Sequence, residues 1–357
     1  MQAYTAVMDL EQPARVIAAH LAEWGEPHVE RAIFLDPAPA AIAQLTDAFC
    51  RQHLGAGIER SEFYQSSIGS VHGLRLTDGR RVVLKAHQPG RSAEFLAEVL
   101  RVQRHLVEAG FPAPRPLIGP VPFGRGLAIV EELLERGERG GARRPESRRA
   151  LASSLHEIVA LCRPLVDGTR LLAHLHSNLP SGRLWPTPHS KLFDFEATAA
   201  GAEWIDALAA EARGLLVTPA GEKIIGHCDW RMEHVRFEGT RVVAAYDWDS
   251  LCHEHETVLL GSVAHGFTAD WTLDDPRQAP SLDEARAFVA DYEDARGRAF
   301  TPAERKGVSA AFTYAVAYTA RCGHALDPLS AEVEEGTFRA LARTMARMGP
   351  GVAGTVL

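Results

Sequence analysis

The sequence predicts an α+β fold of two lobes, a small N-lobe with an antiparallel sheet and a larger, mostly helical C-lobe. Three observations lead to this prediction. Residues 58–134 combine short apolar, strand-like runs with one long helical pattern. A charged, glycine-rich stretch follows at 135–149, and beyond it most apolar residues recur at helical spacing. At 357 residues the chain is also longer than one hydrophobic core usually supports.

Composition and charge narrow the class of protein. Apolar residues make up 46% of the chain and charged residues 24%, as in an ordinary folded protein. A net charge of −8 disfavours nucleic acid as a partner, because phosphate binding requires a basic face. The five cysteines form no CxxC pair, so we expect no disulfide framework and a cytoplasmic protein. Neither a secretory signal nor a long apolar run is evident, so we expect no membrane partner. The expected oligomeric state is a monomer or a homodimer.

The first part of the chain is predicted to contain helices followed by a sheet. Helices are expected at 13–24, at 38–54 and at 91–109, the last ending at Gly110. Strands are expected at 58–65, at 71–77, around Val82–Lys85 after an Asp78-Gly79 hairpin turn, and at 126–134. We therefore divide the chain into an N-terminal helical extension (1–57), the N-lobe (58–134) and the C-lobe (135–357).

The C-lobe is predicted to be helical, with two short strands. Helices are expected at 147–177, 194–213, 254–268, 282–296 and 302–322, and strands at 222–227 and 240–249. Two helices begin with capping boxes, SLDE at 281–284 and TPAE at 301–304. Residues 135–149 lack an apolar period, and we interpret them as a mobile connection between the lobes.

Four features that can carry chemistry follow one another along the chain. They are Lys85 on a strand, the acids Glu94 and Glu98 on the next helix, the stretch HCDWRMEH at 227–234, and YDWD at 246–249. In this order they resemble the aminoglycoside phosphotransferase family, within the protein-kinase-like fold, over residues 58–325. The catalytic loop of that family is H-G-D, four residues and Asn. Here His227-Cys228-Asp229 is followed by four residues and His234.

The resemblance implies an ATP-dependent kinase with a role for each matched residue. Asp229 would orient or deprotonate the acceptor hydroxyl. Lys85 would bind the α- and β-phosphates, with Glu98 holding its ammonium group. Asp247 would bind Mg²⁺, a hard cation that prefers carboxylate oxygens. His227 is expected to fix the loop backbone. ATP is the expected nucleotide, with GTP as the alternative.

Two positions depart from the family pattern. His234 stands where the family has Asn as a second metal ligand, and imidazole is a poorer partner for Mg²⁺. Three interpretations of His234 therefore stay open. It binds a metal, it contacts phosphate, or its presence indicates that the protein has lost activity. The stretch at 64–73 lacks the full G-x-G-x-x-G pattern, so phosphate binding would depend on Ser67, Ser70 and nearby glycines. The resemblance also implies an adenine-binding backbone at Glu132, Leu133 and Leu134.

Other polar groups have a structural and a functional interpretation. The run HEHETV at 253–258 is expected to be a solvated helix start, with metal binding as the alternative. Cys228 is interpreted as a packing residue, because no lysine or helix N-terminus is evident beside it. Trp230 and Trp248 are expected in the core. Acids are dense at 270–294, which indicates either a solvated helix face or contacts to a cationic substrate. The candidate substrate contacts are Asp249, Asp270, Trp271 and Asp274.

Three functions remain open from the sequence. The first is an ATP-dependent O-phosphotransferase acting on a hydroxyl of a small molecule, such as an aminoglycoside-like antibiotic or another metabolite, cationic ones included. The second is a nucleotide-binding pseudokinase without turnover, suggested by His234. The third is a metal-dependent hydrolase, which would need a tightly bound transition metal. Its ligands would come from His227, Asp229, Asp247, Asp249 and the HEHE cluster at 253–256.

Overall fold

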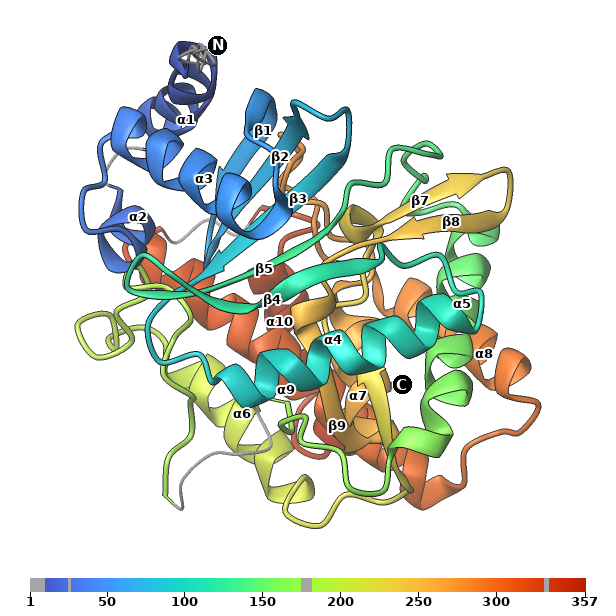
Figure 1. Cartoon of the computed structure of the whole chain (residues 1–357). Coiled ribbons are helices and arrows are strands. Elements are labelled where there is room, and N and C mark those ends of the chain that lie inside the picture. The colour runs from blue at the N-terminus through green and yellow to red at the C-terminus, as the bar shows by residue number, and fades with distance from the viewer. Residues whose placement is uncertain (1–9, 25–26, 175–181, 331–333) are drawn as a thin grey trace, which may run out of the picture. The chain divides into compact units, whose positions relative to one another are not determined.

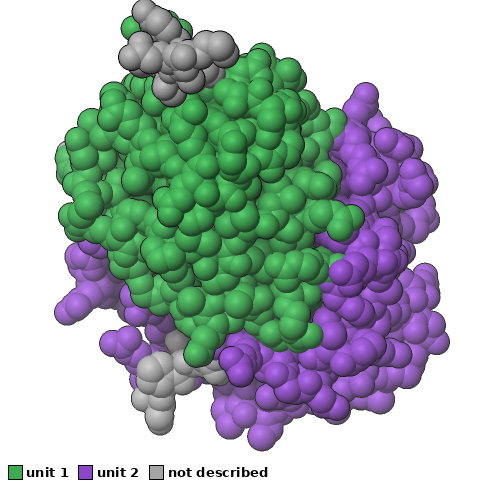
Figure 2. All heavy atoms as spheres, in the orientation of Figure 1, with its two compact units in different colours: residues 1–104, 114–135 green, residues 105–113, 136–357 purple. Residues whose placement is uncertain are grey.

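The structure, a computed structural model, describes residues 10–24, 27–174, 182–330 and 334–357. The chain divides into two compact units, which Figure 2 shows in different colours. Unit 1 comprises residues 1–104 and 114–135, and unit 2 comprises residues 105–113 and 136–357. One contains a five-stranded antiparallel sheet and the other is mostly helical, so the predicted α+β class is confirmed. The domain boundaries at residues 57 and 134 stay a prediction.

Unit 1 is built on an antiparallel sheet with the strand order β1-β2-β3-β5-β4 (Figure 1). The strands are β1 (Ile58–Ser66), β2 (Ser70–Leu76), β3 (Arg81–His87), β4 (Pro116–Phe123) and β5 (Gly126–Glu132). The predicted Asp78-Gly79 turn joins β2 to β3. Gly79 has a φ of 87°, a left-handed conformation that glycine adopts without steric cost.

Three helices that precede the sheet share its hydrophobic core. They are α1 (Glu11–Trp24), α2 (His28–Ile33) and α3 (Pro39–Leu54), of which α2 was not predicted. Ile17, Ile33 and Ile42 from these helices are buried in one cluster with Leu74 and Val82 of the sheet. Burying an aliphatic side chain of this size contributes about 1.5–3 kcal/mol. The helices therefore contribute to the stability of the sheet.

β4 is a strand that the sequence did not predict. It contains Pro116, Pro120 and Pro122, which have no backbone N–H to donate to a neighbouring strand. The strand lies at the edge of the sheet and pairs with β5, and edge positions tolerate proline. Proline is a signal against a central strand but not against an edge strand such as β4.

The long helix of the N-terminal half is α4 (Ala93–Glu108), close to the predicted span. Phe95, Val99, Val102 and Leu106 recur along it at three- and four-residue spacing and are buried. Gly110, with a φ of 90°, follows the helix as expected for a glycine that ends one.

Unit 2 is mostly helical. Its helices are α5 (Pro145–Cys162), α6 (Glu203–Leu215), α7 (Glu256–Gly266), α8 (Leu282–Arg296), α9 (Pro302–Leu326) and α10 (Phe338–Arg347), with 3₁₀ turns η1 (Arg163–Leu165) and η4 (Val352–Gly354). α9 packs against α6, α7 and α10, and α5 packs against α8. Both predicted capping boxes are confirmed, Ser281 with Glu284 on α8 and Thr301 with Glu304 on α9. Within the described ranges, no helix combines the length and apolar character needed to cross a membrane.

Two helices of unit 2 differ most from their predicted spans. The helix predicted at 147–177 is α5, which ends at Cys162 and is followed by η1; residues 175–177 lie outside the described part of the chain. The helix predicted at 194–213 begins only at Glu203. The carboxylate of Asp194 accepts the backbone N–H groups of Glu196 and Ala197, so residues 194–202 form local turns instead.

The stretch 135–149 was predicted as a mobile connection between the lobes. Its last residues, from Pro145, are the first turns of α5. Glu138 exchanges two backbone hydrogen bonds with Phe237, of 2.9 and 2.8 Å. Proline at the first helical position is a start signal that the charge-rich pattern masked.

Two small antiparallel strand pairs complete unit 2. β6 (Lys223–His227) pairs with β9 (Leu251–His255), and β7 (Val235–Glu238) pairs with β8 (Arg241–Ala245). The prediction that 253–258 is a solvated helix start was wrong. Residues 253–255 belong to β9, and residues 256–258, which do begin α7, are buried. The pairing buries Glu254 to 2% exposure, and its carboxylate accepts the backbone N–H groups of His174 and His255.

Candidate active site

Lys85 lies on β3 with its side chain buried against a carboxylate. Its Nζ is 3.3 Å from Oε1 of Glu131 on β5, and the two side chains are 8% and 3% exposed. Gln103 on α4 donates to the other oxygen of Glu131 at 2.9 Å. A buried ammonium group needs such a partner, because desolvating an isolated charge is costly. Sequence reasoning missed Glu131. Glu131 could have been found only from the pairing of β3 with β5. It lies opposite Val83, which is two residues from Lys85 and on the same face of the strand.

Glu98, the predicted partner of Lys85, is buried on α4 at 8% exposure. Arg101, one turn further along, donates two hydrogen bonds to the Glu98 carboxylate, of 2.8 and 2.7 Å. Such a two-point arginine contact orients the carboxylate. Glu94, the other acid considered, is exposed in the first turn of α4. The pairing of Glu98 with Lys85 stays a prediction.

The stretch predicted to bind phosphate is the turn that joins β1 to β2. Ser67 is exposed, and its N–H donates to the Gly69 carbonyl at 3.0 Å. Ser70 is buried and its side chain is hydrogen-bonded to Tyr64. A Cβ at residue 69 would lie 2.6 Å from the Ala86 carbonyl oxygen, so this close approach requires glycine. Phosphate binding by Ser67 and Ser70 stays a prediction.

The end of β5 was predicted to present backbone groups to adenine. The N–H of Glu132 donates to the Arg115 carbonyl at 3.0 Å, and the N–H of Leu133 donates to the Arg81 carbonyl at 3.1 Å. Both amides are therefore used within unit 1. Adenine binding at Glu132, Leu133 and Leu134 stays a prediction.

Unit 2 brings the two predicted catalytic stretches together. β6 leads into Asp229 and the turn η2 (Met232–His234), and β8 leads into Asp247 and the turn η3 (Trp248–Ser250). Main-chain bonds join the two loops: Tyr246 N–H donates to the His234 carbonyl at 2.9 Å, and Cys228 N–H to the Ser250 carbonyl at 3.0 Å. The position of one candidate carboxylate, Asp229, therefore depends on that of the other, Asp247.

Asp247 has an unusual backbone conformation. Its φ of 64° is left-handed, which costs a non-glycine residue of order 1–3 kcal/mol. The next residue, Trp248, is fully buried and donates from Nε1 to the Ala245 carbonyl at 2.9 Å, which holds the turn in place. Ser250 Oγ donates to Asp247 Oδ2 at 2.7 Å and orients the carboxylate. Trp230 is also buried, so the prediction that both tryptophans lie in the core is confirmed.

His227 links the two loops through its side chain. The ring is completely buried and lies 5.3 and 5.6 Å, centroid to centroid, from the rings of Trp230 and Trp248. Burial lowers the pKa of His227, although the Asp247 carboxylate opposes the effect. The neutral ring donates from Nε2 to the Tyr246 carbonyl at 3.1 Å. These contacts agree with the structural role that the sequence suggested.

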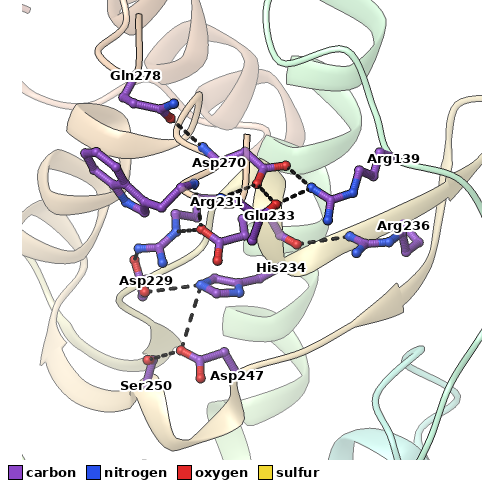
Figure 3. A network of polar contacts seen from close by, with 12 residues as sticks. Arg139, Asp229, Arg231, Glu233, His234, Arg236, Asp247, Ser250, Asp270 and Gln278 are labelled. Atoms are coloured by element: carbon purple, nitrogen blue, oxygen red, sulfur yellow. Dashed lines mark hydrogen bonds and ion pairs between the residues drawn. The ribbon is translucent and has the colours of Figure 1, made fainter. Parts of the chain in front are cut away.

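Asp229 lies between Arg231 and His234 (Figure 3). Arg231 Nη1 donates to Asp229 Oδ1, and His234 Nε2 lies 3.2 Å from Asp229 Oδ2. Burial alone would raise the pKa of Asp229, but the Arg231 guanidinium and the His234 ring hold it well below its usual range. The carboxylate is thus ionised at neutral pH, and a hydroxyl group can donate to it. Sequence reasoning missed Arg231, whose only signal was its place two residues after Asp229.

Asp229, His234 and Asp247 form a candidate cation site. In the described part of the chain they are the group of acidic and histidine side chains whose ligating atoms all lie within 4.8 Å of one another. His234 Nε2 is 3.2 Å from Asp229 and 3.9 Å from Asp247. Because an ionised carboxylate only accepts, Nε2 carries the proton in its contact with Asp229 in this structure. The Asp247 carboxylate therefore fits Mg²⁺, with Asp229 and His234 beside it. Metal binding by His234 stays a prediction.

Asp270, a candidate substrate contact, already has cationic and hydroxyl partners (Figure 3). Arg139 Nη1 and Thr272 Oγ1 both donate to its carboxylate. Its charge is thereby largely neutralised, which disfavours a second cation. Asp274 is exposed, and Asp249 lies in η3, two residues after Asp247.

Glu233 connects Trp271 with the catalytic loop. Its Oε2 accepts the backbone N–H of Trp271 at 3.2 Å and Arg231 Nε at 3.1 Å. The Trp271 side chain is 51% exposed. The same arginine that contacts Asp229 is therefore fixed from its other side by Glu233, a residue that the sequence did not single out.

Cys228 has polar partners that correct its interpretation as a simple packing residue. Its Sγ donates to the Ser250 carbonyl at 3.0 Å. Hydrogen bonding to Cys252 on β9, together with the charge of His174, lowers the pKa of the Cys228 thiol, although burial opposes the shift. Both partners are distant in sequence, and the β6–β9 pairing brings Cys252 close.

Comparison with known proteins identifies the family of the chain. A model described as the phosphotransferase enzyme family matches residues 73–308, which include Lys85, Asp229 and Asp247. The chain belongs to this phosphotransferase family. The predicted enzyme class, a small-molecule phosphotransferase, is thereby confirmed. No curated protein matches the sequence significantly.

Solved structures agree with this phosphotransferase in fold. An amicoumacin kinase in complex with AMP-PNP, Ca²⁺ and Ami has a TM-score of 0.52 at 12% identity, covering 81% of this chain and 87% of that one. A spectinomycin phosphotransferase in complex with ADP and spectinomycin has a TM-score of 0.52 at 14% identity, covering 88% and 97%. A choline/ethanolamine kinase family protein from Mesorhizobium loti has a TM-score of 0.51 at 15% identity, covering 87% and 98%.

Proposed function

We propose that this phosphotransferase transfers the γ-phosphate of ATP to a hydroxyl group of a small molecule. The observation that carries the proposal is the arrangement of Asp229, His234 and Asp247, with Asp229 held ionised by Arg231. Phosphoryl transfer needs mainly positioned reactants and neutralised charge, and two carboxylates joined through a donor suit both tasks. Nucleotide complexes of two structural neighbours support ATP, with GTP as the alternative.

Asp229 orients the acceptor in this mechanism. Its low pKa makes it a weak base, so it accepts a hydrogen bond from the hydroxyl and takes the proton late, as the O–P bond forms. A loose transition state with little bond formation to the nucleophile requires no stronger base. Arg231 keeps the carboxylate in place, and Glu233 keeps Arg231 in place.

The other charged residues bind the nucleotide. Lys85 contacts the α- and β-phosphates, and its ammonium group is held by Glu131, with Glu98 as the further predicted partner. Mg²⁺, when bound, neutralises charge on the β- and γ-phosphates. Asp247, oriented by Ser250, is its main protein ligand. His234 donates to Asp229 and stabilises the ionised carboxylate.

The acceptor is a small hydroxyl-bearing molecule. Antibiotics and amino alcohols are the acceptors suggested by the names of the structural neighbours, so an antibiotic-modifying role belongs to the proposal. Asp249, Asp274 and Trp271 are the remaining candidates for a cationic acceptor, because Asp270 is already paired with Arg139.

A screen with γ-labelled ATP tests the proposal. The purified protein with Mg²⁺ is incubated with aminoglycosides, spectinomycin, macrolides, choline and ethanolamine, and labelled product is separated. We expect transfer to at least one hydroxyl compound, and its loss on chelation with EDTA. Stabilisation by Mg²⁺-ATP without transfer to any compound would instead favour the pseudokinase, which His234 in place of the family Asn suggests.

The hydrolase alternative finds less support. In the described residues, the candidate metal ligands Asp229, His234 and Asp247 are joined neither by His227 nor by the histidines of β9. His227 donates to a backbone carbonyl instead. Elemental analysis of the purified protein is expected to show no stoichiometric transition metal.

A further inference from the structure

The helices before the sheet contact the turn predicted to bind phosphate. This turn, Ser66–Ser70, joins β1 to β2 and contains the exposed Ser67. His20 lies in the last turns of α1, which packs beside β1 (Figure 1). The family match begins at residue 73, so the helices lie before the part of the chain that it covers.

His20 makes two hydrogen bonds to the first residue of the turn. The backbone N–H of Ser66 donates to His20 Nε2 at 3.0 Å, and the Ser66 hydroxyl lies 2.9 Å from the same nitrogen. A backbone N–H can only donate, so Nε2 is the acceptor and the ring is neutral, with its proton on Nδ1. Burial lowers the pKa of His20, which agrees with a neutral ring, although Glu30 and Glu23 oppose the effect.

The other end of the turn is held from α2. Glu30, 1% exposed, accepts a hydrogen bond of 3.0 Å from the Tyr64 hydroxyl, and Tyr64 is hydrogen-bonded to Ser70. The rings of His20 and Tyr64 meet edge to face at 5.6 Å. Side chains from two helices thus hold Ser66 and Ser70, and the residues between them carry the exposed serine and the tightly packed Gly69.

We infer that His20 is a positioning residue for the nucleotide. Its neutral imidazole fixes the main chain at Ser66 and keeps the turn in the conformation that receives the phosphates of ATP. The inference rests on the proposed function, because it concerns the turn to which phosphate binding was assigned. It gives the helices before the sheet a role in substrate binding besides their role in the hydrophobic core.

The same helix provides a matched control. Gln12 also makes two hydrogen bonds to β1, from Nε2 to the Ser61 carbonyl at 3.0 Å and from the Ser61 N–H to Oε1 at 2.8 Å. These bonds lie five residues before Ser66. Removing either side chain removes two hydrogen bonds between α1 and β1. Only the change at His20 removes hydrogen bonds to the turn Ser66–Ser70.

The experiment compares ATP binding by the full-length wild type and three variants. Isothermal titration with Mg²⁺-ATP gives Kd, and kinetics with a saturating acceptor separates KM for ATP from kcat. His20→Ala is expected to raise Kd and KM for ATP about tenfold, roughly the effect of one or two lost hydrogen bonds, with kcat little changed. His20→Gln, whose Oε1 can accept at a similar distance from the backbone, is expected to restore most of the affinity. Gln12→Ala is expected to stay within about twofold of the wild type.

Hydrogen exchange gives an independent reading of the turn. Without nucleotide, the Ser66 amide is expected to exchange faster in His20→Ala than in Gln12→Ala. If the wild type binds ATP and His20→Ala binds it with the same affinity, the inference is overturned but the proposed function is not. The same holds if His20→Ala and Gln12→Ala weaken ATP binding equally. A wild type that fails to bind ATP would overturn the proposed function and, with it, this inference.

Discussion

Replacing His227 with phenylalanine tests whether this residue is structural. The change keeps an aromatic ring beside Trp230 and Trp248 but removes Nε2, which donates to the Tyr246 carbonyl at 3.1 Å. Leaving such a group without its partner costs about 1–3 kcal/mol. For a unit of this size each kcal/mol corresponds to roughly 2–4 °C in Tm, so we expect a loss of about 2–12 °C.

Activity gives the second readout of this change. Burial lowers the pKa of His227, so its ring is neutral and does not act as the acid or base in the neutral range. His227→Phe should therefore lower kcat, because the loops of Asp229 and Asp247 lose a link, without changing the shape of the pH–rate profile. Thermal unfolding and kcat between pH 6 and 9 measure both effects. If His227→Phe kept the wild-type Tm but lost the acidic or the basic limb of the pH–rate profile, the structural role of His227 would be refuted.

Three further predictions follow from single contacts. His234→Asn supplies an amide oxygen in place of a donor, and the Mg²⁺ concentration for half-maximal transfer should fall about tenfold. Hydrogen bonds from Arg298, and next from Thr301, lower the pKa of Glu304 from 4.5 to about 2, so its ionised form stabilises the fold above pH 4.5. Glu304→Ala should cost about 1 kcal/mol at pH 7, a difference that disappears as the pH falls from 4.5 through 2. Iodoacetamide should modify Cys228 at a rate that levels off at a lower pH than for an ordinary thiol, because hydrogen bonding to Cys252 lowers the pKa of Cys228.

For each of these three predictions, one result would contradict the reasoning. An unchanged Mg²⁺ requirement in His234→Asn would contradict the donor role of His234. A stability difference for Glu304→Ala that persists at pH 2 would contradict the ionic contact with Arg298. An alkylation rate at Cys228 that rises up to pH 8.5 would indicate an unperturbed thiol.

The sequence was sufficient for features that depend on local patterns. The helices beginning with Ser281 and Thr301 start where their capping boxes predict, and the Asp78-Gly79 turn lies where the hairpin signal indicated. The order of Lys85, Asp229 and Asp247 suggested the phosphotransferase family, and a family match over residues 73–308 confirms it.

Contacts between distant segments could not be derived in this way. Glu131 reaches Lys85 through the register of β3 and β5, which no local pattern specifies. The run at 253–258 has acids and histidines that suit a helix start, but pairing with β6 makes its first half a strand. His20 gave no signal, because its partner Ser66 lies 46 residues away.

Transfer by an Asp229→Asn variant tests the central claim most directly. The change keeps the size of the side chain and removes the charge that orients the acceptor hydroxyl. With an acceptor identified from the screen, we predict that kcat falls at least about 100-fold while Kd for Mg²⁺-ATP stays within about twofold. Asp283→Asn, at a side chain 93% exposed on α8, serves as the control and should transfer like the wild type. Transfer by Asp229→Asn at the wild-type rate would contradict the account.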